Sequence, residues 1–301
     1  LTINSSVSRL HYVFYIFMVD PKKLKLKVIS YEKFRDITKS IQIVALSNIS
    51  ELKENIANRF LALTPFLSFF NIKHYAECEN MQCLVMPITI DKNCCGPHNN
   101  EIFGATEEII DTLEETFNTV RTFSTGVRCR VTMLSNYPGS LIKHIARYNK
   151  DIAAFSIFSF SIIVEKIIKL NLDRYFIIFN RFISVFAQET SCYQICSFNE
   201  FTNILVDKVD LNESIFHRVA LDNKDFPNYL SDLYNFGLSL VLMDAFEENE
   251  YSSLGARIVA MDSAKKNAGK LIEELTIKYH RARQESITNE LIEIVSCANF
   301  V

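Results

Sequence analysis

The end of this chain contains no proline after Pro227, a run of 74 residues. Asp225 and Pro227 stand where the N-cap and first turn of a helix are expected. A helix over 225–301 would be on the order of 105 Å long at about 1.5 Å per residue. No small globular domain buries a helix of that length, so most of it requires a partner outside an ordinary core.

The same stretch carries a heptad pattern of apolar residues. Apolar side chains recur in four-three steps, with Lys265 filling one gap, and after Ala282 the pattern slips by one residue. The regular seam is Leu254, Ile258, Met261, Ala268, Ile272, Leu275, Tyr279 and Ala282, followed by Ile287, Leu291, Ile294 and Ala298. A seam of this kind predicts a helix that packs along a second helix.

The start of the chain supplies a partner for it. Residues 21–65 are predicted to form one helix, because Pro21 suits its first turn and Pro65 its end. Apolar residues recur there at steps of three and four, at Phe34, Ile37, Ile41, Ala45, Ile49, Leu52 and Ile56. We expect the two terminal helices to form a long antiparallel coiled coil. The residues expected to pack in it are Ile41, Val44, Leu254, Ile258, Met261, Ile272, Leu275, Ile287 and Leu291.

The middle of the chain, 72–205, alternates between strand and helix patterns. Strands are expected at 83–90, 127–134 and 151–155, and two more around a turn in 175–195; helices are expected at 101–121, 140–148 and 159–170. This alternation predicts a Rossmann-like α/β domain. The fold class is therefore α/β, with four parts: an extension over 1–20, a helix over 21–65, a domain over 72–205 and a helix over 225–301.

Chemistry-bearing motifs are few. The sequence has no G-x-x-x-x-G-K-[ST], G-x-G-x-x-G, H-E-x-x-H or G-x-S-x-G, so no nucleotide loop, catalytic residue or cofactor is expected. Cys94, Cys95 and His98 are the nearest approach to a metal or nucleophile site. We expect neither, because a fourth ligand and an orienting third group are missing. The eight cysteines are expected to be reduced, and a net charge of −3 gives no indication of nucleic-acid binding.

Several segments resemble the gamma subunits of F-type ATP synthases. Residues 256–272, ARIVAMDSAKKNAGKLI, resemble the family pattern ARMxAMDxASKNAxxMI, and residues 275–296 continue it. Shorter matches lie at 36–45 (DITKSIQIVA), 91–99 (DKNCCGPHN) and 175–184 (YFIIFNRFIS), in the family's order. Ile41 and Ile43 replace the family's usual Met pair, and residues 135–160 match poorly.

The resemblance implies a non-catalytic rotor. In that family the paired helices enter the ring of three α and three β subunits, and the middle domain forms a foot on the c-ring beside the small delta and epsilon subunits. Arg283 and Gln284 match the family's Arg-Gln pair and, with Arg257, are expected to contact a β subunit. The protein is expected to be peripheral to the membrane and not a homo-oligomer.

Two other classes remain open: a structural coiled-coil tether carrying an α/β domain, which predicts a homodimer, and an enzyme with a site in the middle domain. The location implied by the resemblance is the matrix side of the mitochondrial inner membrane. Residues 1–19 contain Arg9, several serines and no acidic residue, which suits the remnant of an import segment or an ordinary strand or helix start.

Overall fold

The computed structural model describes residues 20–70, 80–91, 93–116, 119–145, 157–208 and 226–298. The chain divides into two compact units. The helical unit is Leu1–Val44 with Ala260–Val301, and the sheet unit is Ala45–Val259. No helix in the described ranges is both long enough and apolar enough to cross a membrane.

Two long helices contribute residues to both units. α2 spans Pro21–Phe70 and α8 spans Phe226–Ala298. The Asp20 carboxylate accepts a hydrogen bond from the Lys22 backbone N–H at 2.9 Å, which satisfies one of the free donors at the start of α2. α2 continues through Pro65, where the sequence predicted its end, because loss of one backbone donor does not by itself stop a helix.

The sheet unit contains a five-stranded sheet in the order β3-β2-β1-β4-β5. β1 pairs in parallel with β2 and β4, β2 pairs in parallel with β3, and β4 and β5 form an antiparallel hairpin. The strands are β1 Gln82–Pro87, β2 Thr119–Thr125, β3 Leu141–Ile145, β4 Arg174–Ser184 and β5 Ala187–Cys196. The mixed α/β fold predicted from the sequence is confirmed.

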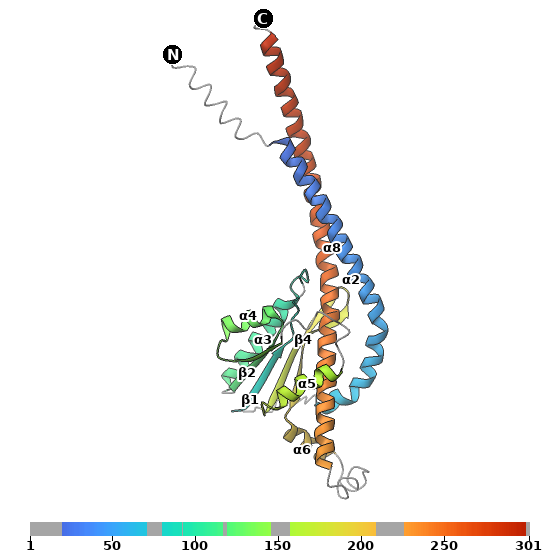
Figure 1. Cartoon of the computed structure of the whole chain (residues 1–301), viewed down its shortest axis with the longest axis vertical. Helices are drawn as coiled ribbons and strands as arrows, with labels where there is room; N and C mark the ends of the chain where they lie inside the picture. Colours follow the sequence, from blue (N-terminus) through green and yellow to red (C-terminus); the bar gives the residue numbers. More distant parts are fainter. Residues whose placement is uncertain are drawn as a thin grey trace. The chain divides into compact units, whose positions relative to one another are not determined.

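Helices cover both faces of this sheet (Figure 1). α3 (His98–Glu115) and α4 (Val127–Asn136) pack on one face, around Cys83, Val85, Ile102 and Met133 among others. α5 (Ile157–Ile168) and the first half of α8 pack on the other. Alternate residues of β1 point to opposite faces, so Leu84 and Met86 belong to the second core. A further helix, α6 (Phe198–Lys208), follows β5.

Parts of the middle domain differ from the sequence prediction. Residues 127–134, expected as a strand, belong to α4, and residues 141–145, expected within a helix, form β3. The helix expected over 101–121 ends at Glu115, and β2 begins at Thr119. The strand expected at 151–155 lies outside the described residues. The helix near 159–170 and the two strands of 175–195 are present.

Candidate functional site

Few large apolar side chains are buried in the described part of the seam between α2 and α8, although several are half-buried. Among the described residues of the helical unit, the buried positions are Leu24 and Thr38 on α2, and Met261, Ala268 and Ala282 on α8. Thr38 donates its hydroxyl to the Arg35 carbonyl of its own helix at 2.7 Å. Small side chains in a seam let two helices approach closely, but they bury little apolar surface. The seam alone is therefore a weak source of stability.

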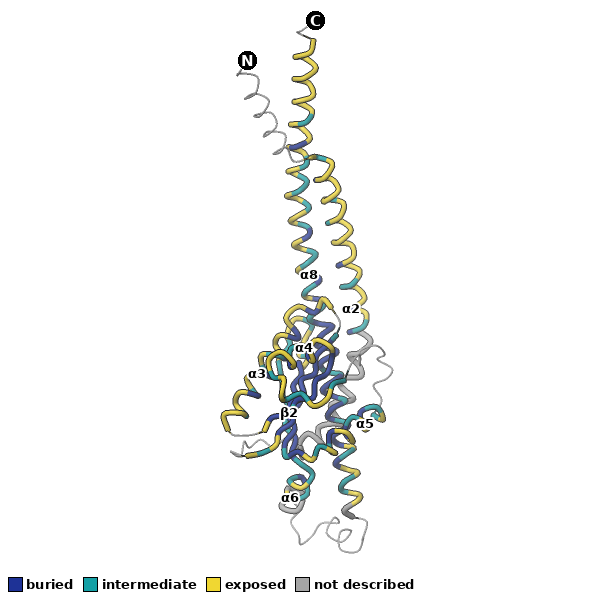
Figure 2. The backbone as a smooth tube through the Cα atoms, turned by 60° about the vertical axis from the view of Figure 1, so that its left-hand side comes forward, coloured by how far each residue is buried: buried dark blue, intermediate teal, exposed yellow. Residues whose placement is uncertain are grey.

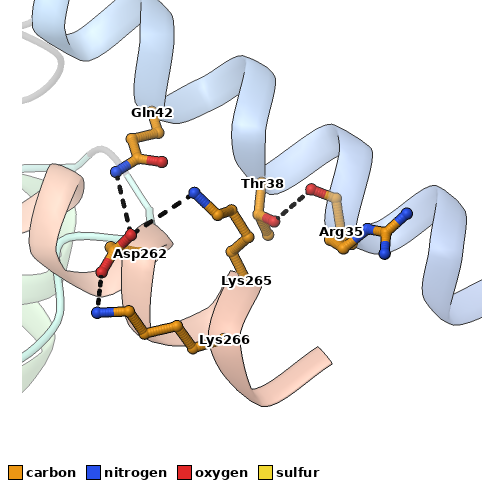
Figure 3. Close-up of polar contacts among 6 residues, drawn as sticks. All are labelled: Arg35, Thr38, Gln42, Asp262, Lys265 and Lys266. Carbon is orange, nitrogen blue, oxygen red and sulfur yellow. Dashed lines mark hydrogen bonds and ion pairs between the residues drawn. The ribbon is translucent and has the colours of Figure 1, made fainter. Parts of the chain in front are cut away.

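Polar contacts add to this seam where α2 and α8 meet (Figure 3). Gln42 Nε2 lies 3.5 Å from Asp262 Oδ1, and Lys266 Nζ lies 2.6 Å from Asp262 Oδ2. The hydrogen bond from Lys266 lowers the pKa of the Asp262 carboxyl. Lys265, which fills the gap in the heptad pattern, also approaches Asp262, at 3.7 Å. At the position where the heptad pattern lacks an apolar residue, Lys265 therefore makes a polar contact.

An apolar cluster joins the two helices in the sheet unit. Leu254 and Ile258 of α8 are buried against Ala45 and Ile49 of α2. Phe182 and Val185, from the β4–β5 hairpin, pack on the same cluster. Residue numbers rise along α2 as they fall along α8, so the two helices run antiparallel here. Hairpin and helices are thus joined through one small core.

The other residues predicted to pack divide into two groups. Met261 is buried, and Ile41, Ile272 and Leu275 are half-buried. Val44, Ile287 and Leu291 are 60%, 44% and 57% exposed, so the expectation that they pack within this chain is wrong. For Val44 the reason is geometric, because the buried stripe of α2 passes through Ala45 and Ile49 and leaves Val44 on the outer side.

Large apolar side chains instead lie on the outside of the helical unit. Figure 2 shows exposed residues along the last turns of α8. At a rotation of about 100° per residue, the exposed apolar residues of its final segment cover nearly half of the helix circumference. The exposed set is Leu26, Ile29, Phe34, Ile37, Ile43 and Val44 on α2, and Leu271, Ile277, Ile287, Leu291, Ile292, Ile294 and Val295 on α8. We call these residues the apolar exterior.

The three residues predicted to contact another subunit lie in different environments. Arg283 and Gln284 are exposed on α8 beside buried Ala282. Arg257 is half-buried, and its Nη2 donates to the Cys95 sulfur at 3.3 Å. Burial raises the pKa of the Cys95 thiol, an effect that the Arg257 guanidinium opposes. Arg257 therefore holds a loop of its own sheet unit, whereas Arg283 and Gln284 stay predictions for an external contact.

His98 is buried, and its ring contacts side chains of the β4–β5 hairpin. Its Nδ1 lies 3.1 Å from both Gln188 Oε1 and Asn180 Nδ2, and burial lowers the pKa of the imidazole. Cys94 is exposed, with a positive φ of 67°. No group of three or more His, Cys, Asp or Glu side chains in the described ranges is placed to hold a metal ion.

Sequence reasoning missed a buried polar cluster on α8. Asn249 is fully buried, and its side chain contacts the backbone of β4 and of the residue that follows β1. The available signal was its position: the buried stripe of Tyr234, Leu238, Leu242 and Ala245 continues, four residues on, to Asn249. The sequence analysis did not follow this stripe, and the surrounding Glu and Ser residues add no apolar signal to it.

Comparison with known proteins agrees with this architecture. The family model described as ATP synthase matches residues 20–301. The ATP synthase gamma chain of Ehrlichia chaffeensis is 26% identical over 289 residues, covering 93% of this chain and 98% of the relative. The mitochondrial ATP synthase subunit gamma of Arabidopsis thaliana is 25% identical, covering 90% of this chain and 82% of the relative.

Solved structures show the same fold. A chain in the cryo-EM structure of the Euglena gracilis mitochondrial ATP synthase, OSCP/F1/c-ring, in rotational state 3, superposes with a TM-score of 0.77 at 21% identity. The match covers 93% of each chain. A chain of the rotor of the same enzyme, in rotational state 1, gives a TM-score of 0.71 at 20% identity, covering 89% of this chain and 98% of the other. The family match extends from the start of α2 to the last residue, and the chain belongs to the ATP synthase gamma chain family.

Proposed function

We propose that this chain is the central-stalk rotor subunit of a proton-translocating ATP synthase, and that it carries rotation of the c-ring to the catalytic subunits. The observation that carries the proposal is the apolar exterior: in the described part of the helical unit, exposed large apolar side chains outnumber the two buried ones, Leu24 and Met261. A self-sufficient coiled coil has the reverse arrangement, with its large apolar residues inside. Covering each of these half-exposed Leu, Ile, Val or Phe side chains stabilises an assembly by roughly 1–1.5 kcal/mol, about half of the value for full burial.

The proposed partners follow from the relatives. Solved structures with this fold carry titles that name F1, the c-ring, the rotor and the central stalk. For this chain we propose three α and three β subunits around the helical unit, and the c-ring with the delta and epsilon subunits beside the sheet unit. Mitochondrial relatives from Arabidopsis and Dictyostelium support the matrix side of the mitochondrial inner membrane as its location, although bacterial relatives match as well.

The chain itself is proposed to be non-catalytic. Its sequence has no phosphate-cradling G-x-x-x-x-G-K-[ST] loop. Its part in the reaction is mechanical: an asymmetric helix pair makes different contacts with each catalytic subunit, and those differences in contact free energy bias each subunit between states of different nucleotide affinity.

Native mass spectrometry of the assembly that contains this chain tests the proposal. One copy of the chain is expected with three α and three β subunits. A homodimer of this chain, without catalytic subunits, would instead identify a structural tether and overturn the rotor function.

A further inference from the structure

The first half of α8 buries an unusual number of polar side chains in the sheet unit. Asp244, Asn249, Glu250, Ser252 and Ser253 are each at most 6% exposed. A helix that only covers a sheet is expected to present apolar residues there, because a buried polar group costs free energy unless it is hydrogen-bonded. These side chains therefore require specific partners.

Asn249 has two partners on neighbouring strands. Its Nδ2 donates to the Ile88 carbonyl at 2.9 Å, and its Oδ1 accepts from the Asn180 backbone N–H at 3.2 Å. Ile88 directly follows β1, and Asn180 lies in β4, the strand parallel to β1. One amide side chain of the helix thus bonds the backbones of both strands.

The contact of Asn249 lies at the point where the strand order of the sheet reverses. β1 leads through α3 to β2 on one side, while β4 lies on its other side, so the direction of winding reverses between β1 and β4. Open α/β sheets usually bind their ligands at the carboxyl ends of the strands at such a reversal. Here α8 places Asn249 against that point, and the usual ligand position is used to hold a helix.

Further hydrogen bonds join α8 to the β4–β5 hairpin. Glu248 Oε2 accepts from the Phe182 N–H at 2.9 Å, and Asp244 Oδ2 accepts from the Tyr193 hydroxyl at 2.7 Å. The Tyr234 hydroxyl donates to the Cys196 carbonyl at 2.6 Å, and the Ser252 hydroxyl donates to Gln188 Oε1 at 2.8 Å. Together with the two hydrogen bonds of Asn249, these make six hydrogen bonds between α8 and the strands. We call the α8 residues that form them the α8 clasp: Tyr234, Asp244, Glu248, Asn249 and Ser252.

We propose that the α8 clasp fixes the angular register of α8 against the sheet and carries torque from the sheet unit into that helix. The proposal rests on the rotor function proposed above. Apolar contacts are non-directional and resist rotation of a helix weakly, whereas hydrogen bonds weaken steeply as their angles change. Turning α8 by one residue, about 100°, removes Asn249 from both strands and leaves two buried backbone groups unpaired.

The test compares Asn249→Ala with Ser253→Ala in the assembled ATP synthase. Ser253 is equally buried on the same helix, but its hydroxyl donates at 2.6 Å to the Glu250 carbonyl of α8 itself, so its loss leaves the clasp intact. The catalytic ring is fixed to a surface with rotation blocked, and the angular fluctuations of a bead on the c-ring are recorded. Because Asn249→Ala removes two of six directional contacts, the angular variance is expected to rise, to at most roughly 1.5-fold. Ser253→Ala is expected to match the parental enzyme.

Equal variance for Asn249→Ala and Ser253→Ala overturns the clasp proposal. If Asn249→Ala does not assemble, Asn249→Leu is measured; leucine fills the space that alanine leaves empty, removes both hydrogen bonds, and is expected to give the same rise in variance. An Asn249→Leu variance equal to that of Ser253→Ala overturns the proposal as well. A parental complex in which a bead on the c-ring never rotates during ATP hydrolysis removes the rotor function itself, whatever the variants show.

Discussion

At the scale of single residues, Arg283 is the side chain on which the proposed contact with a β subunit depends. A hydrogen bond to a charged group contributes roughly 1.5–3 kcal/mol. We expect Arg283→Ala to lower coupled ATP turnover in the assembled enzyme and leave assembly largely intact. Arg281→Ala, two residues away and also exposed, is the matched control. Parental turnover in Arg283→Ala would make the contact incidental, and loss of assembly would make it structural.

A second residue-scale prediction concerns His98 and pH. Burial lowers its pKa in the folded chain, while the unfolded value is about 6.5, so below that pH the unfolded state binds more protons. The free energy of unfolding is expected to fall as pH drops from 7.5 to 5.5, by at most about 1.4 kcal/mol per pH unit from this group. Urea unfolding of His98→Gln is expected to show a shallower dependence. His280→Gln, at an exposed position, is expected to follow the parental slope.

At the scale of elements, two glycines of α8 differ in their surroundings. A Cβ on Gly269 would meet nothing within 4 Å, whereas one on Gly255 would lie 3.2 Å from the Val185 carbonyl oxygen of the β4–β5 turn. Alanine is favoured over glycine inside a helix by roughly 1 kcal/mol. Gly269→Ala is expected to raise the free energy of unfolding by up to that amount, and Gly255→Ala by clearly less, in denaturant titrations. Equal gains in the free energy of unfolding would show that the β4–β5 turn leaves room for a Cβ at Gly255.

The elements also show where sequence reasoning succeeds. The two long helices and the β4–β5 hairpin follow from proline placement and long apolar runs. Residues 127–134 suggested a strand because Val127, Cys129, Val131 and Met133 alternate with polar residues. In α4 only Cys129 and Met133, one turn apart, are buried, while Val127 and Val131 are exposed. Exposed valines removed the periodicity that distinguishes a helix from a strand. Asn249 was missed because an amide in a buried stripe looks like a surface residue until its partners are known.

At the scale of the whole molecule, the helical segment 256–296 was enough to indicate the function, but it did not indicate which surface carries that function. Periodicity predicted that Ile287 and Leu291 pack within the chain, and they form part of the apolar exterior instead. A heptad pattern indicates that a side chain will be covered, without indicating whether the cover comes from the same chain.

A whole-molecule prediction follows from the missing phosphate loop. The isolated chain is expected to show no heat of ATP binding by calorimetry at micromolar concentrations, with or without Mg²⁺. The isolated catalytic subunits serve as the positive control. Micromolar affinity on the purified chain would contradict the non-catalytic assignment and direct attention to the sheet unit.

The apolar exterior also has a consequence for how cells make this protein. In a newly synthesised copy, these apolar side chains stay accessible to chaperones and proteases until the other subunits cover them. Surplus copies are then short-lived, and the abundance of the protein follows the supply of its partners more closely than its own rate of translation. Degradation of unassembled copies would thus keep the number of these rotor subunits matched to the number of assembled catalytic subunits.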